Sequence, residues 1–182
     1  MAKLVSTTYG DALFELALEE GNFKEMRAEV EALRQIFVEN EEISAILSHP
    51  QMDKDQKIAF LENIFKGKCS DYMMGFLVLA VEKGRYADII DILDYFIRKA
   101  KEEEGIGIAS VTSAVELTDK GRKVIEERLL ALTSYKSFET TYEVDESIIG
   151  GLVIRIGDKV VDSSIKTKLQ NMKKNLTKIQ LS

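Results

Sequence analysis

The chain has 182 residues, of which 45% are hydrophobic and 31% are charged, and its formal net charge is −6. This composition is typical of a globular protein, and the length suits one large domain or two small ones. The longest uncharged apolar run in the first half, residues 73–81, is far shorter than the roughly 20 residues that a membrane-spanning helix needs. We therefore expect no transmembrane segment.

The beginning of the chain lacks both the apolar core of a secretory signal and the arginine-rich composition of an organelle transit peptide. A single cysteine, Cys69, excludes an internal disulfide and any metal site built from several cysteines. These features favour an unprocessed cytoplasmic protein in which Cys69 is a small apolar residue of the core.

The first 105 residues show the apolar periodicity of helices, interrupted by glycines and by the single proline, Pro50. Helices are predicted at about 6–20, 22–39, 41–47, 53–66, 70–83 and 86–101. Asp53 with Gln56 three residues later predicts a capping box. The segment 70–83 carries apolar residues on every side, which predicts the central helix of a bundle.

After Gly105 the pattern changes to alternating, β-branched segments mixed with two helices. Strands are predicted at about 106–117, 138–144, 152–156 and 159–161, and helices at 118–132 and 163–182. The pair Gly157 and Asp158 tolerates positive φ and predicts a tight turn. The fold class is therefore mainly α with two domains, a six-helix bundle at 1–105 and a small α+β domain at 106–182.

No catalytic pattern is complete. The glycines near Gly151 and Gly105 do not continue into a phosphate-binding loop or a dinucleotide fingerprint. The sole histidine, His49, precedes Pro50 and has too few other ligands nearby for a metal site. No pair of carboxylates stands out as an acid and a base. We predict no catalytic residue, no cofactor and no metal.

Two helices have features of binding surfaces. In the first helix, Phe14 and Leu18 form a second apolar strip, which fits either complete burial or the wall of a groove for a partner helix. The last helix carries five lysines and no acid, as a solvated face would, or as a surface for an acidic partner, nucleic acid or an anionic membrane. Nucleic acid is the weaker choice because no aromatic residues lie among these lysines and the chain is acidic overall.

Both ends of the chain resemble one family, the delta subunit of bacterial and chloroplast F-type ATP synthases, which is related to the mitochondrial oligomycin-sensitivity-conferring protein. The beginning is similar to the family pattern Tyr-Ala-x-Ala-Leu-Phe, and it reads Tyr9-Gly10-Asp11-Ala12-Leu13-Phe14. The second half follows the family in order and spacing at Val144-Asp145, Ile149-Gly150-Gly151, Arg155-Ile156-Gly157-Asp158 and Val161-Asp162-Ser163-Ser164. Gly10 and Ser163 depart from the alanine and glycine that are common in the family.

The resemblance implies a non-catalytic stator subunit. The first domain would bind the N-terminal segments of the alpha subunits of the catalytic head, and the second would bind the b subunits of the peripheral stalk. The link would couple ion translocation to ATP synthesis. The resemblance also implies a peripheral position at the cytoplasmic face of the bacterial plasma membrane, with no nucleic acid and no direct membrane insertion.

Three sets of residues follow from this interpretation. The head-binding set, expected to divide between core and groove, is Tyr9, Ala12, Leu13, Phe14, Leu16, Phe76 and Leu77. The stalk-binding set is Ile165, Lys166, Leu169, Met172 and Lys173. The structural motif is Gly150, Gly151, Gly157, Asp158, Asp162 and Ser164, in which Asp162 is predicted to cap the last helix.

Three alternatives remain open from the sequence. The main one is a generic helical adaptor with a basic tail helix, which would have other partners. The second is a nucleic-acid-binding protein that uses the last helix, whose affinity would fall steeply with salt. The third is a small hydrolase, which would need activity in the isolated chain.

Overall fold

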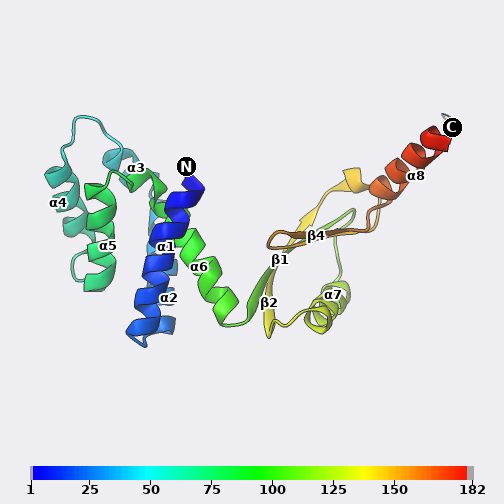
Figure 1. Ribbon diagram of the computed structural model, residues 1–182, viewed down its shortest axis with the longest axis horizontal. Helices are drawn as coiled ribbons and strands as arrows, with labels where there is room; N and C mark the ends of the chain where they lie inside the picture. The colour runs from blue at the N-terminus through cyan, green and yellow to red at the C-terminus, as the bar shows by residue number, and fades with distance from the viewer. Residues whose placement is uncertain (1, 180–182) are drawn as a thin grey trace. The chain divides into compact units, whose positions relative to one another are not determined.

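The computed structural model describes residues 2–179, and the side chains of residues 4–174. Within that range eight α-helices, two short 3-10 helices and four strands follow one another along the chain (Figure 1). The chain divides into two compact units, residues 1–100 and 101–182. The prediction of a mainly helical fold with a small sheet in the C-terminal part is confirmed.

The first unit is built from six helices, the last of which continues into the second unit. Their bounds are α1 (Ala2–Glu19), α2 (Phe23–Glu39), α3 (Glu41–Leu47), α4 (Lys54–Phe65), α5 (Asp71–Glu82) and α6 (Ile89–Glu103), with the 3-10 helix η1 (Tyr86–Asp88) before α6. The helix α1 begins at Ala2, earlier than predicted, and η1 replaces the first turn of the predicted helix 86–101.

Side-chain caps explain where two of these helices begin. The Asp53 carboxylate accepts a hydrogen bond from Gln56 N at 2.8 Å, and the Gln56 side chain accepts one from Asp53 N, which confirms the capping box. Ser70 Oγ accepts from Met73 N at the start of α5. The position of Asn22 directly after Gly21 predicts that it caps α2, but it makes no such hydrogen bond.

A continuous apolar core holds the first unit together. The stripe of α2 is buried at Met26, Val30, Leu33 and Phe37, as its spacing predicts. Phe37 stacks on Phe65 of α4, with ring centroids 5.8 Å apart. The helices α4 and α5 run side by side (Figure 1). Burial of these side chains is the main favourable term for folding this unit.

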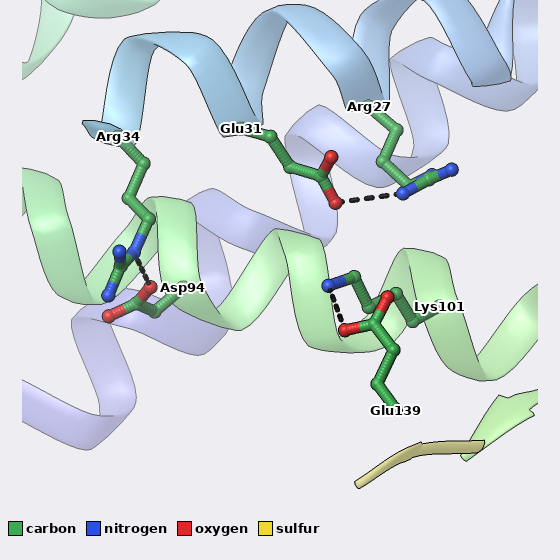
Figure 2. Close-up of polar contacts among 6 residues, drawn as sticks. All are labelled: Arg27, Glu31, Arg34, Asp94, Lys101 and Glu139. Carbon is green, nitrogen blue, oxygen red and sulfur yellow. Dashed lines mark hydrogen bonds and ion pairs between the residues drawn. The ribbon is translucent and has the colours of Figure 1, made fainter. Parts of the chain in front are cut away.

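Three polar contacts fasten α6 to α1 and α2. Figure 2 shows Arg34 of α2 beside Asp94 of α6, with Nε 2.5 Å from Oδ1. Asp11 of α1 accepts hydrogen bonds from the Tyr95 hydroxyl at 2.9 Å and from Lys99 Nζ at 2.5 Å. The hydrogen bond from Lys99 is the main reason that the pKa of Asp11 lies below its usual range.

The second unit contains a four-stranded sheet in the order β2-β1-β3-β4. Its elements are β1 (Ile106–Ser113), α7 (Asp119–Leu132), β2 (Ser137–Val144), the 3-10 helix η2 (Glu146–Ile148), β3 (Leu152–Ile156), β4 (Lys159–Asp162) and α8 (Ile165–Ile179). The strands β1 and β2 are parallel, as their connection through α7 requires. The turn between β3 and β4 has Gly157 at φ 55°, and Ile156 pairs with Lys159, so the predicted tight turn is confirmed.

Two predictions for the second unit are wrong in detail. The strand β1 ends at Ser113, whose hydroxyl donates to Val115 O at 2.6 Å, rather than near residue 117. The spacing of Val124, Ile125, Leu129 and Leu132 predicts that all four face inward from α7, but only Leu129 is buried, and Val124 and Leu132 are exposed. The small sheet does not cover the whole apolar face of this helix. Near the boundary between the units, Lys101 lies 2.7 Å from Glu139 of β2 within the second unit (Figure 2).

We expect Gly10→Ala to destabilise the protein, although alanine is common at this position in the family. A Cβ at Gly10 would collide with the ring of Tyr95. Such overpacking costs about 1–3 kcal/mol, which exceeds the roughly 1 kcal/mol gained from helix propensity. Chemical denaturation measures the change in the free energy of unfolding. The cost of Gly10→Ala should be smaller in a Tyr95→Ala background, and a variant at least as stable as the wild type would contradict the prediction.

Candidate partner-binding surfaces

The helix α5 has an exposed face, so the prediction that it is covered on every side is wrong. Tyr72 and Leu79 are each 41% exposed, and Gly75 between them is also exposed. Positions three and four residues apart share one side of a helix, so these residues form one strip. We call Tyr72, Gly75 and Leu79 the α5 strip. The opposite side is buried at Met73, Phe76, Leu77, Ala80 and Val81.

Gly75 has no structural explanation within the first unit. A Cβ added there would meet no atom within 4 Å, so internal packing does not demand a glycine. Glycine in the interior of a helix costs about 1 kcal/mol relative to alanine. The α5 strip therefore combines two apolar side chains with a shallow point that could admit the backbone of another helix.

The α5 strip adjoins the end of α1. A hydrogen bond to the Glu20 carboxylate is the main cause of a raised pKa for Tyr72. Leu18, near the same end of α1, is 51% exposed. An apolar surface edged by carboxylates thus lies where the C-terminal end of α1 meets the N-terminal end of α5.

The structure divides the predicted head-binding set. Its core members are Leu13, Phe14, Phe76 and Leu77, all of them buried. Ala12 is exposed, and Tyr9 and Leu16 are half-buried against the core. Tyr72, Gly75 and Leu79 were not in the predicted set. The signal in the sequence that marks this side of α5 is Gly75, a glycine in the middle of a strongly apolar helix.

The apolar stripe of α8 is the second candidate surface. Ile165, Leu169 and Met172 are all exposed, with fractions that rise along the helix. Lys166, Lys168 and Lys173 of the same helix are also exposed. Leu176 and Ile179 continue the stripe in the sequence, but their side chains lie outside the described residues. The predicted stalk-binding set therefore lies on an accessible, amphipathic helix.

Four residues of the predicted motif, Gly150, Gly151, Asp162 and Ser164, position the beginning of α8, whereas Gly157 and Asp158 form the turn between β3 and β4. Gly150 O accepts a hydrogen bond from Ile165 N at 2.9 Å. A Cβ at Gly151, whose φ is 81°, would lie 2.5 Å from Ser163 O, so only glycine allows this close contact. The contacts of these residues are structural and position the helix.

Ser164, rather than Asp162, is the residue that caps α8. Ser164 Oγ accepts from Thr167 N at 3.2 Å. Asp162 supports this cap from one turn outside, because Oδ1 accepts from Ser164 N at 2.8 Å and Oδ2 accepts from the Thr167 hydroxyl at 2.7 Å. These hydrogen bonds, with the one from Thr167 first, lower the pKa of Asp162. The sequence identified the capping region but not the division of roles.

The remaining chemical candidates show no site. Among the described residues, no group of three or more His, Cys, Asp or Glu could hold a metal ion. Cys69 is half-buried, and burial is the main cause of its raised pKa. His49 Nδ1 accepts a hydrogen bond from Gln51 N at 3.3 Å, which is a local turn contact. Of the helices described, none has the length and apolar character to cross a membrane.

Comparison with known sequences decides the family. The model of the ATP synthase delta (OSCP) subunit family matches residues 5–176, nearly the whole chain. The chain belongs to this family. The delta subunit is a non-catalytic subunit of the ATP synthase stator, and the same role follows for this chain by family identity.

Individual relatives agree along the full length. The ATP synthase subunit delta of Lachnoclostridium phytofermentans is 54% identical over 181 residues, which cover 100% of both chains. The subunit delta of Desulforamulus reducens is 36% identical and covers 94% of each chain. A chain of the Toxoplasma gondii mitochondrial ATP synthase has the same fold, with a TM-score of 0.78 at 16% identity over 94% of this chain and 97% of that one.

The ionised form of Asp162 should stabilise the start of α8. Because its pKa is lowered on folding, this contribution is present above the ordinary aspartate pKa of about 3.9 and is lost as the pH falls through the lower folded value. We expect an NMR titration of the Asp162 carboxyl to have its midpoint below 3.9. Amide protection at Ser164 and Thr167 should fall in the same acid range, and this response should be absent in Asp162→Asn. A midpoint at or above the ordinary value would contradict the prediction.

Proposed function

We propose that this stator subunit binds its two neighbours through separate units. Residues 1–105, a six-helix bundle domain, bind the N-terminal segments of the alpha subunits of the catalytic head. Residues 106–182, a small α+β domain, bind the b subunits of the peripheral stalk. The observation that carries the proposal is a family match over nearly the whole chain, in which each of the two units leaves apolar residues exposed on a helix.

The α5 strip and the adjoining end of α1 are the surface proposed for the head. An amphipathic helix can lay its apolar side against Tyr72 and Leu79, with Gly75 allowing close approach. Ala12 and Leu16 of the predicted set belong to the accessible or half-buried part of α1. The buried members of that set support the surface from inside by fixing α1 and α5 in the core.

The surface proposed for the stalk is the stripe of α8 with its lysines. A two-sided link of this kind keeps the head from rotating with the central rotor, so that ion translocation remains coupled to ATP synthesis. The assembled subunit would be peripheral, at the cytoplasmic face of a bacterial plasma membrane. The family assignment replaces the generic adaptor as the interpretation of the basic tail helix.

Leu79→Asp should abolish binding to the isolated catalytic head while leaving the helical circular dichroism intact. Leu79 is 41% exposed, so the charge is tolerated in the free protein but would be buried without a partner in the complex. Val38→Asp on α2, at 42% exposed, is the matched control and should keep head binding. Size-exclusion chromatography of each variant with the purified catalytic head measures its head binding.

The same variants separate the two halves of the proposal. Leu79→Asp should still bind a soluble segment of the host's b subunit, because the proposed stalk surface lies in the other unit. Loss of both partners by a folded Leu79→Asp chain would contradict the division into two surfaces. Equal head binding by Leu79→Asp and wild type would exclude the α5 strip.

Gly75→Ala should raise the stability of the free chain and weaken head binding. Removing an exposed glycine from a helix interior stabilises the helix by about 1 kcal/mol, and open space surrounds the new methyl group. The same methyl group would hold a partner helix away from α5. Thermal denaturation and head titration measure the two effects. Gly121→Ala in α7 is the control, with an ordinary contact distance of 3.5 Å to Thr118 and no expected effect on the head.

A further inference from the structure

Ile149 has a strained backbone conformation, and burial of its side chain within the second unit does not compensate for the strain. Among residues 2–179 it is the one non-glycine residue with positive φ, at φ 69° and ψ −37°. For a β-branched residue this conformation costs free energy and persists only where the surrounding structure fixes it. The side chain is 60% exposed, so burial within the second unit does not offset the cost.

Contacts in the turn before Ile149 fix its backbone. Ile149 N donates to Glu146 O at 3.0 Å, and the Asp145 carboxylate accepts from Ser147 N at 2.9 Å, which closes the turn η2. The preceding residue, Ile148, is buried. Two successive branched side chains therefore have opposite environments, with Ile148 in the unit and Ile149 largely in solvent.

Ile149 lies directly before the residue that contacts the first turn of α8. The next residue, Gly150, lies directly beneath Ile165, because a Cβ at Gly150 would be 2.7 Å from Ile165 Cδ1. The Lys166 ammonium also reaches Ser147 Oγ of η2 at 3.2 Å. Ile149, Ile165, Leu169 and Met172 are all exposed apolar residues. We call these four residues the α8 seam.

The spacing of the α8 seam specifies the shape of its partner. Ile165, Leu169 and Met172 are separated by four and then three residues, and Leu176 and Ile179 repeat this spacing in the sequence. A strict four-three repeat gives a narrow stripe that packs against one other helix in a left-handed coiled coil. Such packing buries side chains that the second unit leaves in water.

The lysines specify the charge of that partner. Lys166, Lys168 and Lys173 each adjoin a seam residue, which places them at the flanking positions of the repeat. Charges at these positions face those of the partner helix. A second copy of α8 would bring lysine against lysine, which is unfavourable, whereas glutamate or aspartate at the partner's flanking positions would pair with them.

The geometry points to the α8 seam as a docking surface for a single acidic helix with a heptad repeat of apolar residues, in which Ile149 is the anchor at one end. The inference rests on the proposed function, because the helix would come from the b subunits of the stalk. It goes further in naming Ile149, the pairing geometry and the charge pattern. The turn contacts that hold Ile149 at positive φ fix its position before the partner arrives.

Ile149→Gly in the full-length chain tests the anchor. Glycine adopts positive φ without strain, so the thermal midpoint should be unchanged or higher. Affinity for a soluble segment of the host's b subunit, measured by calorimetry, should fall about tenfold or more, as for a buried apolar anchor. Leu132→Ala, which removes an exposed leucine on α7, is the matched control and should bind as the wild type does.

Charge reversal tests the partner pattern. Lys168→Glu with Lys173→Glu should weaken binding of the same segment, and the salt dependence of the wild-type affinity should be reduced or inverted in this variant. Lys120→Glu with Lys123→Glu on α7 is the control, with no expected change. If the wild-type chain binds the segment and Ile149→Gly binds it equally well, Ile149 is not the anchor, but the assignment of α8 to the stalk still holds. Failure of the folded wild-type chain to bind the segment would overturn both.

Discussion

Packing from one side only shapes the two helices on which the proposed binding depends. In the first unit the core holds α5 through Met73, Phe76 and Leu77, and the opposite side, with Tyr72 and Leu79, is left in water. In the second unit α8 is fixed at its first turn by the backbone of Gly150, and its apolar stripe has no cover within the described part of the unit. A subunit that couples other proteins without chemistry needs such faces, because apolar burial supplies most of the free energy of association.

Both faces carry a local feature that lowers the stability of the free chain. Gly75 weakens α5 without any packing reason, and Ile149 holds a branched side chain at positive φ. Each feature lies near exposed apolar residues, and the proposed approach of another helix would explain both. Natural proteins commonly lose stability in this way where a surface is shaped for a partner. The rest of both units follows ordinary rules of capping and burial.

Much of the fold follows from local sequence signals. The capping box at Asp53, the stripe of α2 and the turn at Gly157 each depend on a few neighbouring residues, and each is where the sequence predicts it. The division of α1 and α5 into buried and exposed sides could not be predicted, because it depends on which distant helices pack against them. In the same way Ser164 displaced Asp162 as the direct cap of α8, since the Gly151 contact with Ser163 sets where the helix begins.

The contact between Gly10 and Tyr95 links two helices that are far apart in the sequence. The ring of Tyr95 occupies the space of a Cβ at Gly10, and its hydroxyl donates to Asp11 one residue further along α1. The two positions therefore form a matched pair, in which the small residue on α1 and the aromatic residue on α6 depend on each other. Exchange of α1 alone with a relative that has alanine at this position would break the pair, whereas α1 and α6 together form a transferable module.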